Sequence, residues 1–100
     1  MIYENNFKND EELFKDAKSE CNITWQDEDT DKKIRNAINQ GIDVLQNDFG
    51  TSIDFDEDLQ ARGLLKTYVR YVWNNSEEYF IENNLQNLLK LEVKYGKNWF

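Results

Sequence analysis

The chain has 100 residues, of which 39% are hydrophobic and 14% aromatic, enough for one domain and too many for a disordered chain. Its 20 acidic and 12 basic side chains give a net charge of −8, which argues against sequence-independent DNA binding because phosphates repel an acidic surface. No apolar run approaches the roughly 18 residues of a membrane span, and we expect no signal peptide because the N-terminal stretch lacks a basic region followed by an apolar one.

A short helix near the N-terminus is the first predicted element. Asn9 or Asp10 can cap its start. Its apolar side consists of Leu13, Phe14 and Ala17. Cys21, the one cysteine of the sequence, follows this helix and forms no intramolecular disulfide, which is typical of a reducing compartment. We interpret Cys21 as a small buried hydrophobe near a helix end.

The clearest predicted helix covers residues 29–49, where apolar side chains recur at spacings of three and four, as on one face of an α-helix. The stripe, with Gly41 among its members, consists of Ile34, Ala37, Ile38, Ile42, Leu45 and Phe49. Gly50 is expected to end the helix in the left-handed conformation. Residues 51–56 then form a short connection that places Ile53 and Phe55 on the core.

Two further helices are predicted, one over residues 57–74 and a last one that begins after Ser76 as its N-cap. Asn74 and Asn75 mark the break between them. The first carries an apolar stripe of Leu59, Leu65, Val69 and Val72, widened by Leu64, Tyr68 and Tyr71. The last carries Tyr79, Phe80, Leu85, Leu88, Leu89 and Val93. The sequence therefore predicts an all-α fold without β-sheet: a single domain over residues 1–100, a small helical bundle of three main helices plus a short N-terminal helix.

Two acidic clusters, residues 27–31 and 54–58, each precede a long predicted helix. A calcium loop of the EF-hand type needs glycine at its sixth position and glutamate at its twelfth, and both clusters fail at both positions. The first turn of a helix exposes unpaired N–H groups that Asp and Thr side chains satisfy. We therefore interpret both clusters as helix caps and expect no metal site.

The sequence does not indicate catalytic machinery. It contains no histidine, which is the commonest general base near neutral pH, and one cysteine without histidine makes a weak nucleophile. No glycine-rich phosphate loop and no GxSxG motif occur. We expect neither enzymatic activity nor a cofactor.

Charge is distributed unevenly along the chain. Residues 1–58 carry 16 acidic and six basic side chains, a net charge of −10, whereas residues 59–100 carry four acidic and six basic ones, a net charge of +2. Such polarity suits copies that pack acidic side to basic side. Cations on one side of the last helix suit the negative end of its dipole: Lys90, Lys94 and Lys97.

A basic stripe lies on the second long helix, because Arg62, Lys66 and Arg70 recur every four residues. Asp58, one turn before Arg62, can pair with it. The stripe is either a solvated face or a contact with the acidic half of a neighbouring copy, and we predict the contact.

The last five residues, 96–100, hold two large aromatics, Trp99 and Phe100. These either fold back on the core or anchor in the pocket of a partner, since aromatic side chains dominate interface hot spots. We predict the second: a mobile C-terminal segment that adds little to the stability of the monomer and docks on a partner.

Two stretches carry a resemblance to a known family: ITWQDEDTD before the first long helix, and ARGLLKTYVRYVWNNSEEYF across the next helix and the break. Over residues 8–96 the chain resembles the small head–tail connector proteins of long-tailed bacteriophages and prophages, also called adaptor or head-completion proteins. Gly63 departs from the family pattern, because a better helix former is expected there. The final Trp99 and Phe100 are not part of the pattern.

The resemblance implies a structural virion protein without enzymatic activity, cofactor or catalytic residues. Copies would form a homo-oligomeric ring, expected to be a dodecamer, beneath the portal protein after DNA packaging. The ring would extend the DNA channel, through which DNA passes without specific binding, and would offer a platform to the stopper or tail-completion protein. The expected location is the head–tail interface of the virion, and the host bacterial cytoplasm during assembly. The predicted subunit or portal interface consists of Arg62, Lys66, Arg70, Trp99 and Phe100.

Two other functions fit the residues. A small acidic phage protein can mimic DNA and occupy the nucleic-acid site of a host enzyme. The net charge favours this mildly, but the acids gather at helix starts rather than in long regular stripes. A free-standing helical regulator, such as an antitoxin-like partner, is the third hypothesis.

Overall fold

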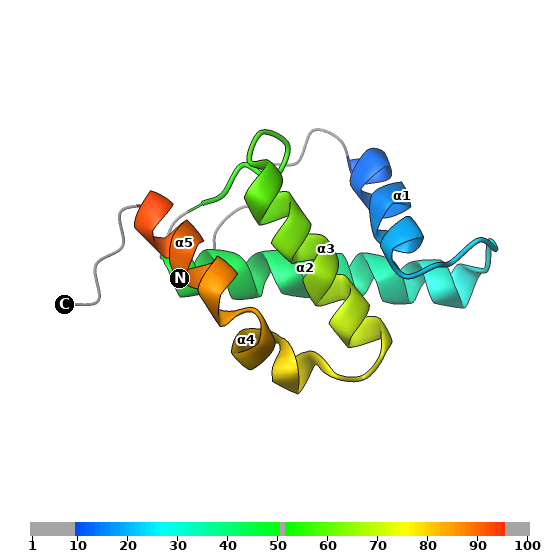
Figure 1. Ribbon diagram of the computed structural model, residues 1–100. Helices are drawn as coiled ribbons and strands as arrows, with labels where there is room; N and C mark the ends of the chain where they lie inside the picture. The colour runs from blue at the N-terminus through cyan, green and yellow to red at the C-terminus, as the bar shows by residue number, and fades with distance from the viewer. Residues whose placement is uncertain (1–9, 51, 96–100) are drawn as a thin grey trace.

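Figure 1 shows the computed structural model, which describes residues 10–50 and 52–95. Its elements are α1 (Asp10–Glu20), α2 (Glu28–Phe49), α3 (Leu59–Trp73), a 3-10 turn η1 (Glu77–Tyr79), α4 (Phe80–Asn83) and α5 (Leu85–Lys94). These described ranges hold no strand, so the predicted all-α bundle is confirmed. The long helix α2 crosses the molecule, and both α1 and α3 pack on it (Figure 1).

Both long helices begin at capping aspartates, as predicted. Asp27 Oδ2 accepts hydrogen bonds from the Thr30 hydroxyl at 2.8 Å and from the Thr30 backbone N–H at 3.0 Å, and these bonds lower the pKa of Asp27. Asp58 Oδ1 accepts the Ala61 N–H at 3.1 Å. Gly50 ends α2 with a φ of 68°, which is the predicted left-handed conformation. The two acidic clusters therefore supply helix caps.

The core lies between α2 and α3, with α1 and the loop after α2 packed against it. Gly41 lets the two long helices approach closely, because a Cβ there would lie 2.6 Å from Leu65 Cδ1 and 2.9 Å from Tyr68 Cδ1. Ile53 and Phe55 in the loop are buried, as predicted. The other fully buried apolar side chains include Leu13, Ile34, Ile42, Leu45 and Val69.

The last predicted helix is not continuous, since it divides into η1, α4 and α5. Asn75 adopts a positive φ of 55° after α3, which confirms the predicted break. Ser76 makes no side-chain cap, because its hydroxyl donates to the Tyr71 carbonyl at 3.2 Å. The Asn84 side-chain amide donates to the Phe80 carbonyl at 2.9 Å. Such local side-chain bonds compete with the helical backbone ladder, which favours the interruption between α4 and α5.

The apolar residues of the C-terminal helices are only partly buried, which corrects the prediction. Phe80, Leu88 and Leu91 enter the core, and the Phe80 ring meets the Tyr68 ring edge-on, with centroids 5.0 Å apart. The remaining predicted core residues here, and the first residue of α3, are exposed: Leu59, Tyr79, Leu85, Leu89 and Val93. The helix α5 therefore uses one side for the core and leaves another apolar side outside.

Candidate interaction surfaces

Arg62, the first residue of the predicted basic stripe, is buried inside the chain. Its guanidinium lies 3.0 Å from Asp16 Oδ2 of α1 and 3.6 Å from Asp56 Oδ1. It also donates a hydrogen bond to the Phe55 carbonyl at 3.3 Å. Arg62 therefore ties α3 to α1 and to the loop after α2. The predicted pairing with Asp58 is not formed, because both groups have other partners.

Arg70 and Lys66 complete the basic stripe and stay at the surface. Arg70 Nη1 lies 3.1 Å from Glu20 Oε2 of α1, and both side chains are partly exposed. Lys66 pairs with no carboxylate in the part of the chain that the structure describes, and it lines a groove. The three basic residues thus have three different environments, and only Lys66 and Arg70 are accessible to a neighbouring copy.

Asp58 joins the start of α3 to the end of α5. Its Oδ2 accepts a hydrogen bond from the Tyr95 hydroxyl at 2.5 Å and lies 3.1 Å from Lys94 Nζ. Burial by itself would raise the pKa of Asp58, but its hydrogen bonds, that with Tyr95 foremost, outweigh burial and lower this pKa. Burial and the same hydrogen bond raise the pKa of Tyr95, so its hydroxyl stays protonated. Lys94, predicted only as a cation near a helix C-terminus, therefore also fixes α5 to α3.

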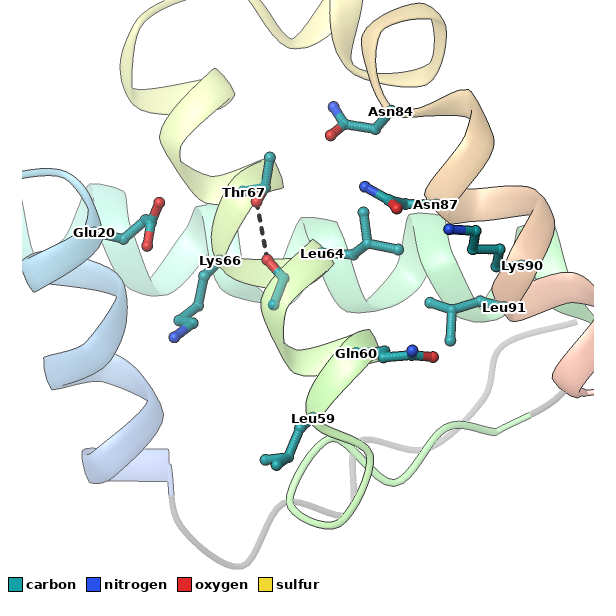
Figure 2. Close-up of a pocket in the computed structure, with 11 residues that line it drawn as sticks. Glu20, Leu59, Gln60, Leu64, Lys66, Thr67, Asn84, Asn87, Lys90 and Leu91 are labelled. Carbon is teal, nitrogen blue, oxygen red and sulfur yellow. Dashed lines mark hydrogen bonds between the residues drawn. The ribbon is translucent and has the colours of Figure 1, made fainter.

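A groove of about 450 Å³ crosses the exposed face of α3 between α1 and α5 (Figure 2). Leu64 of α3 and Leu91 of α5 give it an apolar part, and Lys66 and Lys90 line its two sides (Figure 2). Gly63 lies within it, where an added Cβ would meet no atom within 4 Å. The rest of the lining consists of Glu20, Leu59 and the amide and hydroxyl side chains Gln60, Thr67, Asn84 and Asn87. The lining suits a polar segment with negative charge.

Sequence reasoning missed this groove. Its signals are the amide-rich stretch of residues 83–87 and the helical glycine Gly63, which stood out only as a departure from a family pattern. Lys90 was assigned to the electrostatics of a helix end. These signals identify a groove only after α3 and α5 are placed beside each other, which is a matter of tertiary packing.

An apolar ridge runs along a different side of α5 and consists of Leu85, Leu89 and Val93. Residues spaced by four lie above one another on a helix, so the three side chains form one strip. Their exposed fractions are 49%, 46% and 78%. Single exposed hydrophobes are ordinary on a protein surface, whereas a strip of them marks an interaction site.

An acidic turn, Glu28 and Asp29, forms the first turn of α2. Both side chains are exposed, and neither has an ion-pair partner within residues 10–50 and 52–95. This end of α2 and the helix α5 lie at opposite ends of the molecule (Figure 1). The unpaired carboxylates of the acidic turn are thus remote from α5.

Residues 10–50 and 52–95 hold no group of three or more metal-ligating side chains and no helix long and apolar enough to cross a membrane. Cys21 packs against the core as expected, but it is only partly buried. Burial, and then the charge of Glu20, raise the pKa of its thiol. Because the thiolate is the reactive form, Cys21 is a poor nucleophile at neutral pH.

Fold and surface together define a small all-α domain that exposes a groove, an apolar ridge and an acidic turn. No family model, no curated protein and no solved structure matches the chain. The predicted partner-binding residues Trp99 and Phe100 belong to the segment 96–100, which lies outside the described residues, as does the side chain of Phe49.

Proposed function

We propose that this chain is a subunit of a bacteriophage head–tail connector, a structural virion protein without catalytic activity. Copies form a ring under the portal protein, extend the DNA channel, and present a platform to the stopper or tail-completion protein. The proposal rests on the sequence resemblance over residues 8–96 and on a surface suited to assembly. It assigns the chain no cofactor and no specific contact with the DNA in the channel.

The apolar ridge of α5 is the observation that carries the proposal. Its three side chains are between 46% and 78% exposed, although they stand at the spacing of a buried helix face. Fully burying one Leu or Val side chain contributes about 1.5–3 kcal/mol of favourable free energy. A partner that covers the ridge therefore provides several kcal/mol, which offset part of the cost of association. A domain of this size buries a modest share of its surface, and assembly adds to that share.

The charge distribution supports a contact between unlike surfaces of neighbouring copies. Residues 1–58 have a net charge of −10 and residues 59–100 one of +2, so opposite charges attract copies head to tail. Contacts of this kind close into a ring when the rotation between copies allows it. An excess of negative charge also suits a channel wall, because repulsion keeps the passing DNA from sticking.

Electron microscopy of the protein with its cognate portal protein tests the proposal. We expect a ring on the portal for the wild-type chain. The double variant Leu89→Gln with Val93→Gln should fold and lose the ring, because it removes apolar surface from the ridge. Tyr79→Gln, which removes a comparably exposed hydrophobe from η1, should keep it. A wild-type chain that forms no ring on the portal would overturn the proposal, and a ring formed by the double variant would remove the ridge as its support.

Gel-shift competition separates this proposal from the acidic DNA mimic. A mimic displaces DNA from a host enzyme and stays a monomer or dimer, whereas we expect the chain to leave such complexes unchanged. Asp27 and Asp58 are engaged as helix caps, and Asp31 is paired with Lys18 at 2.8 Å. These acids therefore form no regular array of free charges resembling phosphates.

A further inference from the structure

The groove on α3 carries two uncompensated positive charges. Glu20 also lines the groove, but its carboxylate is paired with Arg70 at 3.1 Å. Lys66 and Lys90 have no ion-pair partner among the residues that the structure describes. Figure 2 shows one of these lysines on α3 and the other on α5. The groove therefore offers a positive surface to an acidic segment.

Gly63 keeps the middle of the groove open. Glycine inside a helix is destabilising relative to alanine, so its presence calls for a reason. No packing within the described chain supplies one, because a Cβ at this position would meet no atom within 4 Å. The Thr67 hydroxyl donates to the Gly63 carbonyl at 3.0 Å, the dashed line in Figure 2. A bare stretch of helix backbone suits the close approach of a second chain.

The acidic turn of α2 has the complementary properties. Glu28 and Asp29 stand in the first turn of the longest helix, and both side chains are exposed. They lie at the end of the molecule opposite α5 (Figure 1). Because Lys90 is on α5, a turn at the opposite end of its own copy does not reach this lysine, so the contact requires a second copy.

We propose that the groove of one copy binds the acidic turn of a second copy, so that the two lysines face the two carboxylates. The contact joins unlike surfaces, so it propagates from copy to copy and closes into a ring if the rotation allows. Charge complementarity determines which surfaces meet and speeds their encounter. This inference rests on the proposed ring assembly, because it specifies the contact between neighbours.

Sedimentation velocity on reversed-charge variants tests the contact. The reversed-groove variant carries Lys66→Glu and Lys90→Glu, and the reversed-turn variant carries Glu28→Lys and Asp29→Lys. We expect the wild-type chain to associate at concentrations up to about 1 mM, which detects millimolar affinity. Each variant alone should associate at least about tenfold more weakly, a loss of about 1.4 kcal/mol.

Mixing the two variants in equal amounts gives the sharpest result. The glutamates of the reversed groove then face the lysines of the reversed turn, and the unchanged groove faces the unchanged turn. We expect association to return in the mixture, with the two variants alternating. If neither variant associates alone and the mixture does not either, the groove and the turn do not meet, and the proposal is overturned.

Two matched controls separate this contact from the effect of net charge. Glu77→Lys with Glu78→Lys reverses another adjacent exposed pair, and Lys15→Glu reverses an exposed lysine of α1. Both should associate like the wild type, and thermal melting checks that every variant folds. Raising the salt from about 0.1 M to about 1 M shortens the Debye length from about 10 Å to about 3 Å and should weaken the wild-type contact.

Gly63→Gln supplies a test that leaves every charge unchanged. Gln is a good helix former, and its Cβ would meet no atom within 4 Å, so the variant should fold at least as stably and associate at least about tenfold more weakly. Unchanged association of the charge variants or of Gly63→Gln overturns the groove contact, as does a wild-type chain that stays monomeric. Microscopy on the portal decides ring formation independently of these results.

Discussion

The helices α2 and α5 are both amphipathic, yet they use their apolar faces differently. α2 lies under α1 and α3, and its stripe is almost wholly buried, with Ile34 and Leu45 at 1% and 0% exposure. α5 packs by one side against α3 and leaves Leu85, Leu89 and Val93 outside. An amphipathic pattern thus indicates that one face of a helix is apolar. Whether that face is buried within the same chain depends on which helices pack against it. We define the body as α1–α3 with the loop after α2, and the edge as α4 and α5.

Charge pairing follows a different boundary. In the body, Arg62 reaches Asp16 and Asp56, and Lys18 reaches Asp31. Within the described ranges, the two lysines of the groove, Lys66 of the body and Lys90 of the edge, have no such partner. Burial of apolar side chains therefore separates the body from the edge, whereas the unpaired lysines come from both, and the following changes test that division.

Truncating a leucine should show the largest difference between body and edge. Leu65→Ala opens a cavity between α2 and α3 and should lower the free energy of unfolding by about 2–5 kcal/mol. Leu89→Ala on the ridge should lower it by no more than about 0.5 kcal/mol. Urea unfolding followed by circular dichroism measures both. A loss at Leu89 comparable with that at Leu65 would mean that the edge is core and not an interface.

Removing an arginine should have the next largest effect. Arg62→Ala removes the ion pairs with Asp16 and Asp56 and should lower the free energy of unfolding by about 2–4 kcal/mol, near the cost of breaking a buried ion pair. Arg70→Ala breaks a partly exposed pair with Glu20 and should cost about 0–1 kcal/mol. The same urea titrations distinguish the two. Equal losses would contradict the assignment of Arg62 to the fold and Arg70 to the surface.

The two helical glycines should respond to alanine with opposite signs. Gly41→Ala forces a methyl group against Leu65 and Tyr68, and this overpacking should outweigh the gain in helix propensity, for a net loss of about 1 kcal/mol. Gly63→Ala meets open space and should raise stability by about 0.5–1 kcal/mol. Thermal melting gives the sign directly. A lower melting temperature for Gly63→Ala would show that packing within the chain requires this glycine. The groove would then not be needed to explain its presence.

The contact between Asp58, at the start of α3, and Tyr95, at the end of α5, should make stability depend on pH. Tyr95→Phe removes a hydrogen bond to Asp58 and should lower the free energy of unfolding at pH 7 by about 1 kcal/mol. Because the pKa of Asp58 is lower in the folded chain, its contribution is complete above the ordinary value of about 4 and disappears as pH falls through the folded value. The difference between wild type and Tyr95→Phe should therefore shrink below about pH 4. A difference that stays constant down to pH 2 would exclude the charged carboxylate as the acceptor.

Much of the fold follows from the sequence, because its signals are local. The caps at Asp27 and Asp58, the left-handed Gly50 and the break at Asn75 each depend on residues within a few positions of one another. The spacing of apolar residues along α2 was sufficient to identify its buried face. These features follow from backbone geometry and helical periodicity, and they do not depend on contacts with residues distant in sequence.

Tertiary structure decided which apolar and charged residues remain outside. Leu89 and Leu88 are neighbours with the same side chain, yet only Leu88 is buried, because α3 lies on its side of α5. Arg62 and Lys66 belong to one basic stripe, yet among the described residues only Arg62 of the two meets carboxylates, those of Asp16 and Asp56. Periodicity says that a face is apolar or basic, but burial and pairing depend on which segments fold back against it. The groove between α3 and α5 exists for the same reason: it is shaped by residues distant in sequence that packing alone brings together.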